Sequence, residues 1–144
     1  MGRDEMTFLL DTNVWIFGYL NLAALPDEIR ELLATRDAQF GLSAISLWEV
    51  GKKHQIGKLQ LHQDLGAWLK GATASNIQIL SLTPEVVADA MNLPDFPVND
   101  PADELIVATA RVHQLTLLTT DTKFKNYRHA RIQYFTPIVE KHRK

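Results

Sequence analysis

The sequence predicts an α/β fold, a three-layer sandwich in which a mainly parallel sheet is flanked by helices. Short apolar runs with strand character alternate with longer helical segments along the whole chain, a pattern typical of strand–helix–strand units with right-handed crossovers. Hydrophobic residues make up 46% of the 144 residues, which is enough to form a core. The chain has no internal repeat or linker, so we expect a single domain over 1–144 with its core at about 7–137.

The first part of the chain provides two expected strands and three expected helices. Residues 7–10 form an apolar run that fits a buried strand, and residues 39–42 form a weaker one. An apolar helix follows over 14–20. The helix over 26–35 opens with a proline and two acids, which the helix dipole favours. The helix over 43–54 opens with a serine, a preferred capping residue.

The middle of the chain provides two helices and one strand. Gly57 marks a break, and a helix is expected to begin at Asp64 and to run through Leu69. Residues 77–80 alternate as a strand does. The helix over 83–92 begins with Thr-Pro-Glu, which combines a cap, a proline in the first turn and an acid.

The last part of the chain provides one helix and two strands. Pro94 and Pro97 make the preceding stretch a loop, and Asp-Pro then opens a helix over 100–112. Strands are expected at 115–119 and 131–135. Because ligands of parallel sheets bind beyond the carboxyl ends of the strands, residues that directly follow a strand are the first candidates for a site.

Composition and charge narrow the class of protein. No apolar run approaches the roughly 18 residues of a membrane-spanning helix, and the polar start of the chain lacks the apolar segment of a secretory signal. We therefore expect no membrane association and a cytoplasmic location. The absence of cysteine excludes disulfides, thiolate zinc sites and a cysteine nucleophile.

The charge is unevenly distributed along the chain, although the net charge is only −2. Residues 1–110 hold 7 Lys and Arg against 15 Asp and Glu, a net charge of −8. Residues 111–144 hold 8 Lys and Arg against 2 Asp and Glu, a net charge of +6. This basic last quarter either attracts a phosphate backbone or is simply solvated.

Four acidic residues stand where strand ends and helix starts would bring them together. They are Asp11, Glu49, Asp103 and Asp121. Clustered carboxylates repel one another and cost free energy unless a cation lies between them. The sequence therefore predicts a site for a hard divalent metal, with phosphodiester chemistry as its use.

Three of these acids and their neighbours also have simpler local explanations. Asp11 suits the cap of the following helix and Asp121 suits a turn. Glu49 suits an exposed ion pair with Lys53, one helical turn away. The hypothesis of a site therefore depends on the set of acids.

The helix that opens at Asp100 gives its two aspartates both a structural and a functional reading. Asp100 fits the N-cap, and Asp103 fits the third helical position, where an acid satisfies free amides and the dipole. Asp103 also shares a stripe with Ile106, Val107 and Ala110. That stripe turns the carboxylate towards the core, where it needs partners.

Four segments together resemble the PIN-domain nucleases, and within them the VapC-type toxins of type II toxin–antitoxin pairs. They are Leu-Leu-Asp-Thr-Asn at 9–13, Ser-Leu-Trp-Glu at 46–49, Asp-Pro-Ala-Asp-Glu-Leu-Ile-Val-Ala-Thr-Ala at 100–110, and Leu-Leu-Thr-Thr-Asp at 117–121. Any single segment is weakly specific, whereas four in this order over residues 7–137 are more specific. One departure is Glu104, because many relatives carry arginine directly after the third acid; the change adds negative charge beside the site.

The resemblance implies a PIN-like fold and an endoribonuclease that hydrolyses RNA phosphodiester bonds with Mg²⁺ or Mn²⁺. The same four acids would bind the metal and carry catalysis, with water as nucleophile and products that carry a 5′-phosphate and a 3′-hydroxyl. Supporting roles are implied for Thr12, Asn13, Asp100 and Thr119. The implied partners are the RNA substrate, a cognate antitoxin and a second copy in a homodimer.

Basic residues near the acids in sequence are candidate phosphate contacts at the rim of the pocket. They are Lys52, Lys53, Arg111 and Lys123. The alternative for each is a solvated side chain without a ligand.

Three other readings fit parts of the sequence. A haloacid-dehalogenase-type phosphatase also places Asp after its first strand, but needs a second Asp where this chain has Asn13. A response-regulator receiver domain needs an acidic pair and a late lysine that we do not place. A non-catalytic PIN-like module would bind RNA or protein and use its acids as caps. Metal-dependent cleavage of RNA separates a nuclease from all three.

Overall fold

The computed structural model describes residues 6–74 and 76–138 and contains one five-stranded sheet. The strands are β1 (Phe8–Leu10), β2 (Phe40–Ser43), β3 (Ile77–Leu80), β4 (Thr116–Thr119) and β5 (Ile132–Tyr134). They lie in the order β3-β2-β1-β4-β5, and every neighbouring pair is parallel. The predicted α/β class with a mainly parallel sheet is confirmed.

Within the described residues, six α-helices and two short 3-10 helices connect these strands. They are α1 (Thr12–Leu20), η2 (Leu22–Ala24), α2 (Asp27–Leu33), α3 (Ala44–Gln55), α4 (Leu65–Ala72), α5 (Pro84–Ala90), α6 (Pro101–His113) and η3 (Thr122–Phe124). Each expected helix is present, with boundaries that differ by a few residues. The sequence analysis did not anticipate η3, whose single turn is too short to show a helical period.

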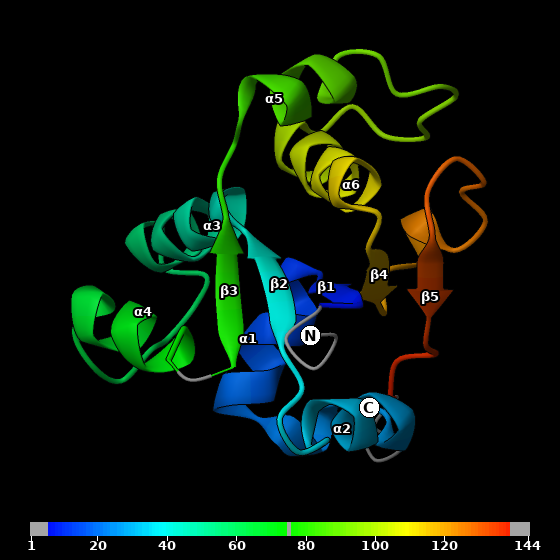
Figure 1. The fold of residues 1–144 in the computed structure, drawn as a ribbon. Coiled ribbons are helices and arrows are strands. Elements are labelled where there is room, and N and C mark those ends of the chain that lie inside the picture. The colour runs from blue at the N-terminus through cyan, green and yellow to red at the C-terminus, as the bar shows by residue number, and fades with distance from the viewer. Residues whose placement is uncertain (1–5, 75, 139–144) are drawn as a thin grey trace, which may run out of the picture.

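Helices cover both faces of the sheet and make the predicted three layers (Figure 1). α6 packs on one face and α5 packs on the outer side of α6, above the sheet as drawn. The first, second and fourth helices contribute to the core on the other face. In the described residues, no helix is both long enough and apolar enough to cross a membrane.

β1 and β4, two neighbouring inner strands, supply both cores by simple alternation. In β1, Leu9 enters the core beneath α6 and Leu10 enters the opposite one. Leu117 and Leu118 do the same in β4, and all four side chains are buried. Successive strand residues point to opposite faces, so a strand covered on both sides must be apolar at every position.

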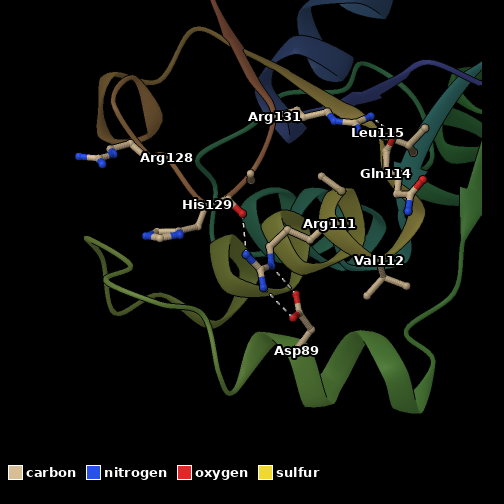
Figure 2. A pocket seen from close by; sticks show the side chains of 10 residues that line it. Asp89, Arg111, Val112, Gln114, Leu115, Arg128, His129 and Arg131 are labelled. Carbon is tan, nitrogen blue, oxygen red and sulfur yellow. Dashed lines mark hydrogen bonds and ion pairs between the residues drawn. The ribbon is translucent and has the colours of Figure 1, made fainter.

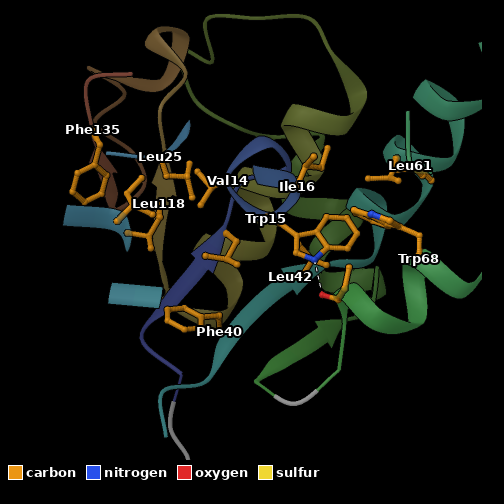
Figure 3. Packing of buried hydrophobic residues seen from close by; sticks show 14 residues of the cluster. Val14, Trp15, Ile16, Leu25, Phe40, Leu42, Leu61, Trp68, Leu118 and Phe135 are labelled. Carbon is orange, nitrogen blue, oxygen red and sulfur yellow. Dashed lines mark hydrogen bonds between the residues drawn. The ribbon is translucent and has the colours of Figure 1, made fainter. Parts of the chain in front are cut away.

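Two tryptophans anchor the core between α1 and α4 (Figure 3). Trp15 and Trp68 are 2% and 0% exposed, and their ring centroids lie 5.3 Å apart in an edge-to-face arrangement. The Trp15 indole nitrogen donates a hydrogen bond to the Ala72 carbonyl at 2.9 Å. Both side chains are therefore part of the protein's own core.

Side-chain caps fix where the helices begin. Ser43 accepts a hydrogen bond from the Ile45 amide at the start of α3, and Thr83 accepts one from the Val86 amide at the start of α5. Both caps are the ones that the sequence predicts. Each satisfies an amide that the first turn leaves free.

The end of the basic last quarter lies outside the described residues, and this applies to Lys141, Arg143 and Lys144. Its earlier basic residues lie near β4 and β5 and are described below.

Candidate functional site

The four acids come from four segments that meet at the carboxyl edge of the sheet. Asp11 directly follows β1, and Asp121 follows β4. Asp103 lies in the first turn of α6, and Glu49 lies in the middle of α3, the helix that follows β2. The charges of Asp103 and Asp121 act on Asp11, and the charge of Glu49 acts on Asp103. The fold thus brings the four carboxylates into one neighbourhood.

Asp11 is buried, with an exposed fraction of 6%. Its Oδ1 accepts a hydrogen bond from the Thr12 amide at 2.9 Å, so it caps α1 as its local reading predicts. Its Oδ2 accepts a hydrogen bond from the Thr119 hydroxyl at 2.7 Å. Thr119 also accepts a hydrogen bond from the Asp121 amide at 3.0 Å, which connects two of the acids through one side chain.

Burial raises the pKa of Asp11 from 3.8 to about 6. The hydrogen bonds from Thr119 and Thr12 oppose this shift, while the charges of Asp103 and Asp121 add to it. Repulsion among the clustered acids thus contributes to the raised pKa of Asp11. The largest cause, however, is loss of water rather than mutual repulsion.

The hydroxyl group of Thr12 links α1 to α3. It lies 2.7 Å from the Ser46 hydroxyl and donates to Glu49 Oε1 at 2.5 Å. The expected ion pair between Glu49 and Lys53 is wrong, because Glu49 turns towards Thr12 and the Lys53 ammonium lies 3.5 Å from Asn13 Oδ1 instead. Ser46 was not among the predicted site residues, although its place one turn before Glu49 puts both on one helix face.

Lys123 lies between two of the acids. Its ammonium nitrogen is 2.7 Å from Asp103 Oδ2 and 3.2 Å from Asp121 Oδ2. Burial alone would lower the pKa of Lys123, but its contacts with the two carboxylates outweigh burial and raise it above the ordinary value. Lys123 is therefore a cation held inside the acidic cluster.

Asp103 is buried with one carboxylate oxygen incompletely satisfied. Its exposed fraction is 6%, and Oδ2 has no hydrogen-bond donor among the described residues. The short contact with Lys123 is an ion pair whose angles fall outside hydrogen-bond geometry. Burial raises the pKa of Asp103, and Lys123 acts in the opposite direction. The Lys123 ammonium lies against this buried oxygen, and a metal ion could take its place.

The remaining predicted residues lie around this cluster. Asp100 is exposed and caps α6 by accepting a hydrogen bond from the Ala102 amide at 3.0 Å. Asn13 is exposed on α1. Asp121 accepts a hydrogen bond from the Lys123 amide at 3.1 Å and so caps η3. Asp121 therefore caps a helix and also belongs to the acidic cluster.

The donor set suits a hard divalent cation, but the side chains are not arranged as a finished metal site. All candidate donors are carboxylate and hydroxyl oxygens, the type that Mg²⁺ and Mn²⁺ prefer. Over residues 6–74 and 76–138, no three acidic or histidine side chains converge closely enough to hold an ion as they stand. Lys123 must leave the space between Asp103 and Asp121 before a cation can enter it.

One predicted phosphate contact lies at the wrong end of the molecule. Arg111 is near the end of α6, roughly 12 Å along the helix from Asp103. It pairs with both carboxylate oxygens of Asp89, at 2.7 and 3.1 Å, and its pKa is raised by this contact. Its predicted position at the rim of the acidic site is wrong, because eight residues of helix separate it from the first turn.

Arg111 instead lines a cavity of about 470 Å³ at the amino ends of β4 and β5 (Figure 2). Leu115, which precedes β4, and Arg131, which precedes β5, also line it. The acids lie beyond the opposite, carboxyl ends of these strands. Since parallel sheets bind ligands at the carboxyl edge, the acidic cluster remains the principal candidate site.

The chain matches known proteins over most of its length. Residues 8–130 match the family model for the PIN domain. The chain is 31% identical over 125 residues to Ribonuclease VapC22 of Mycobacterium tuberculosis, an alignment that covers 87% of this chain and 95% of that protein.

Solved structures share the fold. The DNA-bound VapBC of Salmonella typhimurium aligns with a TM-score of 0.69 and 22% identity, covering 90% of this chain and 98% of that one. A toxin–antitoxin complex from Klebsiella pneumoniae aligns with a TM-score of 0.62 and 20% identity, covering 88% of this chain and 96% of that one. At these identities the likeness concerns the fold.

Proposed function

The chain belongs to the PIN-domain family, and we propose that it is a VapC-type endoribonuclease that hydrolyses RNA phosphodiester bonds with Mg²⁺ or Mn²⁺. The observation that carries this proposal is the enclosed acidic cluster. Asp11 and Asp103 are buried carboxylates from separate segments, and one oxygen of Asp103 lacks a hydrogen-bond donor. Helix capping explains neither burial nor clustering, and the Lys123 ammonium already lies where a cation meets these acids.

Asp11 and Asp103 are the most direct ligands in this proposal, and Glu49 and Asp121 complete the pocket. When bound, the divalent cation neutralises these carboxylates, makes a water more acidic and stabilises charge on the phosphate and the leaving oxygen. The protein supplies no covalent nucleophile. Its part is to place the carboxylates and to hold them there through hydroxyl and amide hydrogen bonds.

The hydroxyl groups beneath the acids orient them. Thr119 holds one oxygen of Asp11, and Thr12 holds one oxygen of Glu49. Thr12 is itself buried against Ser46, so its hydrogen bond restricts the rotamers of the Glu49 side chain. A side chain on an exposed helix face would keep that conformational freedom. Less ordering entropy is then lost when a cation binds.

The proposed partners follow from the same family membership. Its 31% identical relative is named a ribonuclease, and a structural neighbour was solved as a toxin–antitoxin complex. We therefore propose that RNA is the substrate, that a cognate antitoxin covers the site, and that the products carry a 5′-phosphate and a 3′-hydroxyl. A homodimer remains part of this proposal.

Cleavage of a labelled single-stranded RNA tests the activity. We expect cleavage with Mg²⁺ or Mn²⁺, none with EDTA, and a loss of at least about a hundred-fold in Asp11→Asn and in Asp103→Asn. Asp95→Asn is the matched control, because the Asp95 side chain is 92% exposed and outside the cluster. Circular dichroism checks that each variant is folded. Folded Asp11→Asn and Asp103→Asn proteins that cleave at the rate of the control would refute the assignment.

A non-catalytic binding module is the second candidate, and one observation favours it. Asp11, Asp100 and Asp121 each cap a helix, and Lys123 already compensates Asp103 and Asp121. In that case the cluster would be complete without metal. Folded wild-type protein that binds no Mn²⁺ in calorimetry would favour this candidate over the nuclease.

A further inference from the structure

Trp48 is the exposed tryptophan among the three of this chain. Its exposed fraction is 58%, compared with 2% for Trp15 and 0% for Trp68. Large apolar side chains are often exposed singly, and Met91 at 66% is an example. Trp48 differs from such residues because it forms the wall of a cavity that borders the acids.

The cavity lies between α3 and the start of α6 and has a volume of about 490 Å³. Its walls include Ile45 and Trp48 from α3 and Pro101 and Ala102 from α6. They are mainly apolar, and the volume falls within the roughly 300–1,000 Å³ of small-molecule sites. The cavity therefore suits a flat apolar group of about the size of a nucleobase.

This cavity adjoins the proposed catalytic site. Glu49 forms part of its wall, and Ala102 precedes Asp103 in the chain. If the scissile phosphate of an RNA strand lay at the carboxylates, the base of an adjacent nucleotide would reach this cavity. Single-stranded RNA is commonly bound by stacking its bases on aromatic side chains beside a cationic track for the backbone.

Two lysines supply positive charge at the same place. Lys52 and Lys53 both line the cavity, and the Lys52 ammonium lies 5.9 Å from the centroid of the Trp48 ring. Across the described part of the chain, neither lysine forms an ion pair with a carboxylate; Lys52 donates to Gln55 at 2.8 Å and Lys53 approaches Asn13. Glu49 and Asp100 also line the cavity, so its charges are mixed, and the two lysines form the cationic side that suits a phosphate backbone.

We infer that Trp48 is a stacking platform for a base of single-stranded RNA next to the scissile phosphate, with Lys52 and Lys53 on the RNA backbone. This inference rests on the proposed function and adds a base subsite to it. Stacking is tolerant of sequence because every base has a flat face. The subsite therefore strengthens binding at this position without selecting one base.

Fluorescence tests the inference, because Trp48 is the exposed one of three tryptophans. Full-length protein in EDTA, which blocks the proposed cleavage, is titrated with a mixed-sequence single-stranded RNA of about ten nucleotides. We expect quenching, and we expect weaker binding when the same RNA carries abasic residues in its centre. The Trp48→Phe protein should lose most of the quenching, which assigns the signal to this residue.

Anisotropy of a labelled copy of the RNA measures affinity in the variants. We expect Trp48→Ala to bind roughly ten-fold more weakly and Trp48→Phe to bind nearly as well as wild type, because phenylalanine still stacks. Equal affinities of Trp48→Ala and Trp48→Phe would overturn the inference, as would equal affinities of the abasic and intact RNAs. If the cognate antitoxin quenches Trp48 fluorescence and RNA does not, the cavity binds a protein segment. That result would also overturn the inference.

Different experimental results would contradict the inference and the proposed function. If the wild-type protein cleaves no RNA but binds it through Trp48 and through the bases, the base subsite stands and the catalytic assignment fails. If the protein cleaves RNA with metal while Trp48→Ala binds as tightly as Trp48→Phe, the catalytic assignment stands and the subsite fails.

Discussion

Asp11 carries an electrostatic cost, which a cation bound at the proposed site would remove. Its pKa is raised from 3.8 to about 6 by burial, so folding disfavours its charged form. Between these two pH values the folded protein keeps a proton on Asp11 that the unfolded chain releases. The free energy of unfolding therefore falls as pH rises through this window, and the cost is absent below about pH 4.

We predict that metal-free wild type loses on the order of 3 kcal/mol relative to Asp11→Asn as pH rises from 4 to 7. The measurement is urea unfolding of both proteins in EDTA across that range. The difference between the two proteins isolates Asp11 from the other carboxylates, Asp103 among them. A difference that stays constant with pH, or that changes in favour of the wild type, contradicts this account.

Lys123 is the residue that a metal ion has to displace, because its ammonium lies between Asp103 and Asp121. We predict that Lys123→Met binds Mn²⁺ roughly ten-fold more tightly than wild type in calorimetry and unfolds more easily without metal. Lys125→Met is the matched control, since Lys125 is exposed and lies over the Tyr134 ring. Unchanged Mn²⁺ affinity in Lys123→Met would leave Lys123 as the phosphate contact that the sequence predicts.

At the scale of the elements, a single hydroxyl links α1 with α3. Thr12 is buried and contacts both Ser46 and Glu49. We predict that Thr12→Val costs about 1–3 kcal/mol in urea unfolding, because valine keeps the shape but leaves two polar groups without their partner. It should also weaken Mn²⁺ binding, since Glu49 becomes free to turn to solvent.

The control for this substitution is Thr136→Val, at an exposed position beyond β5. Surface changes of this kind normally alter stability by less than about 0.5 kcal/mol. If Thr12→Val and Thr136→Val are equally stable, the contact between α1 and α3 does not position Glu49 as described.

The helices and strands can be predicted from the sequence, whereas the contacts among the site residues can be predicted only in part. Strands and caps depend on neighbours in the chain, and Ser43 and Thr83 cap the helices that local patterns predict. The contact of Lys123 with Asp103 depends on how η3 meets α6, which no local pattern encodes. Arg111 shows the converse, because nearness in sequence to Asp103 does not make it a neighbour in space.

Assembly is the question at the scale of the whole molecule. Trp15 and Trp68 are buried in the core and are not available for an interface. Phe17 is 39% exposed and remains a candidate. We predict a dimer by light scattering on a sizing column, and a shift towards monomer in Phe17→Asp. A wild-type protein that elutes as a monomer at all concentrations contradicts the dimer.

The toxin hypothesis is tested in cells. We predict that induced expression of the chain arrests growth, and that co-expression of a small protein encoded next to it relieves the arrest. Asp103→Asn should not arrest growth, because the proposed toxicity requires metal-dependent cleavage. Unimpaired growth at high expression of wild type would count against a toxin.

The central claim is that carboxylates from four separate segments share one divalent cation. Crystals grown or soaked with Mn²⁺, analysed by the anomalous scattering of manganese, test it most directly. The account predicts a peak between Asp11 and Asp103, with Glu49 and Asp121 around it and with the Lys123 ammonium moved out of the space between Asp103 and Asp121. A cluster without manganese at millimolar concentration, with Lys123 still bridging Asp103 and Asp121, would contradict it.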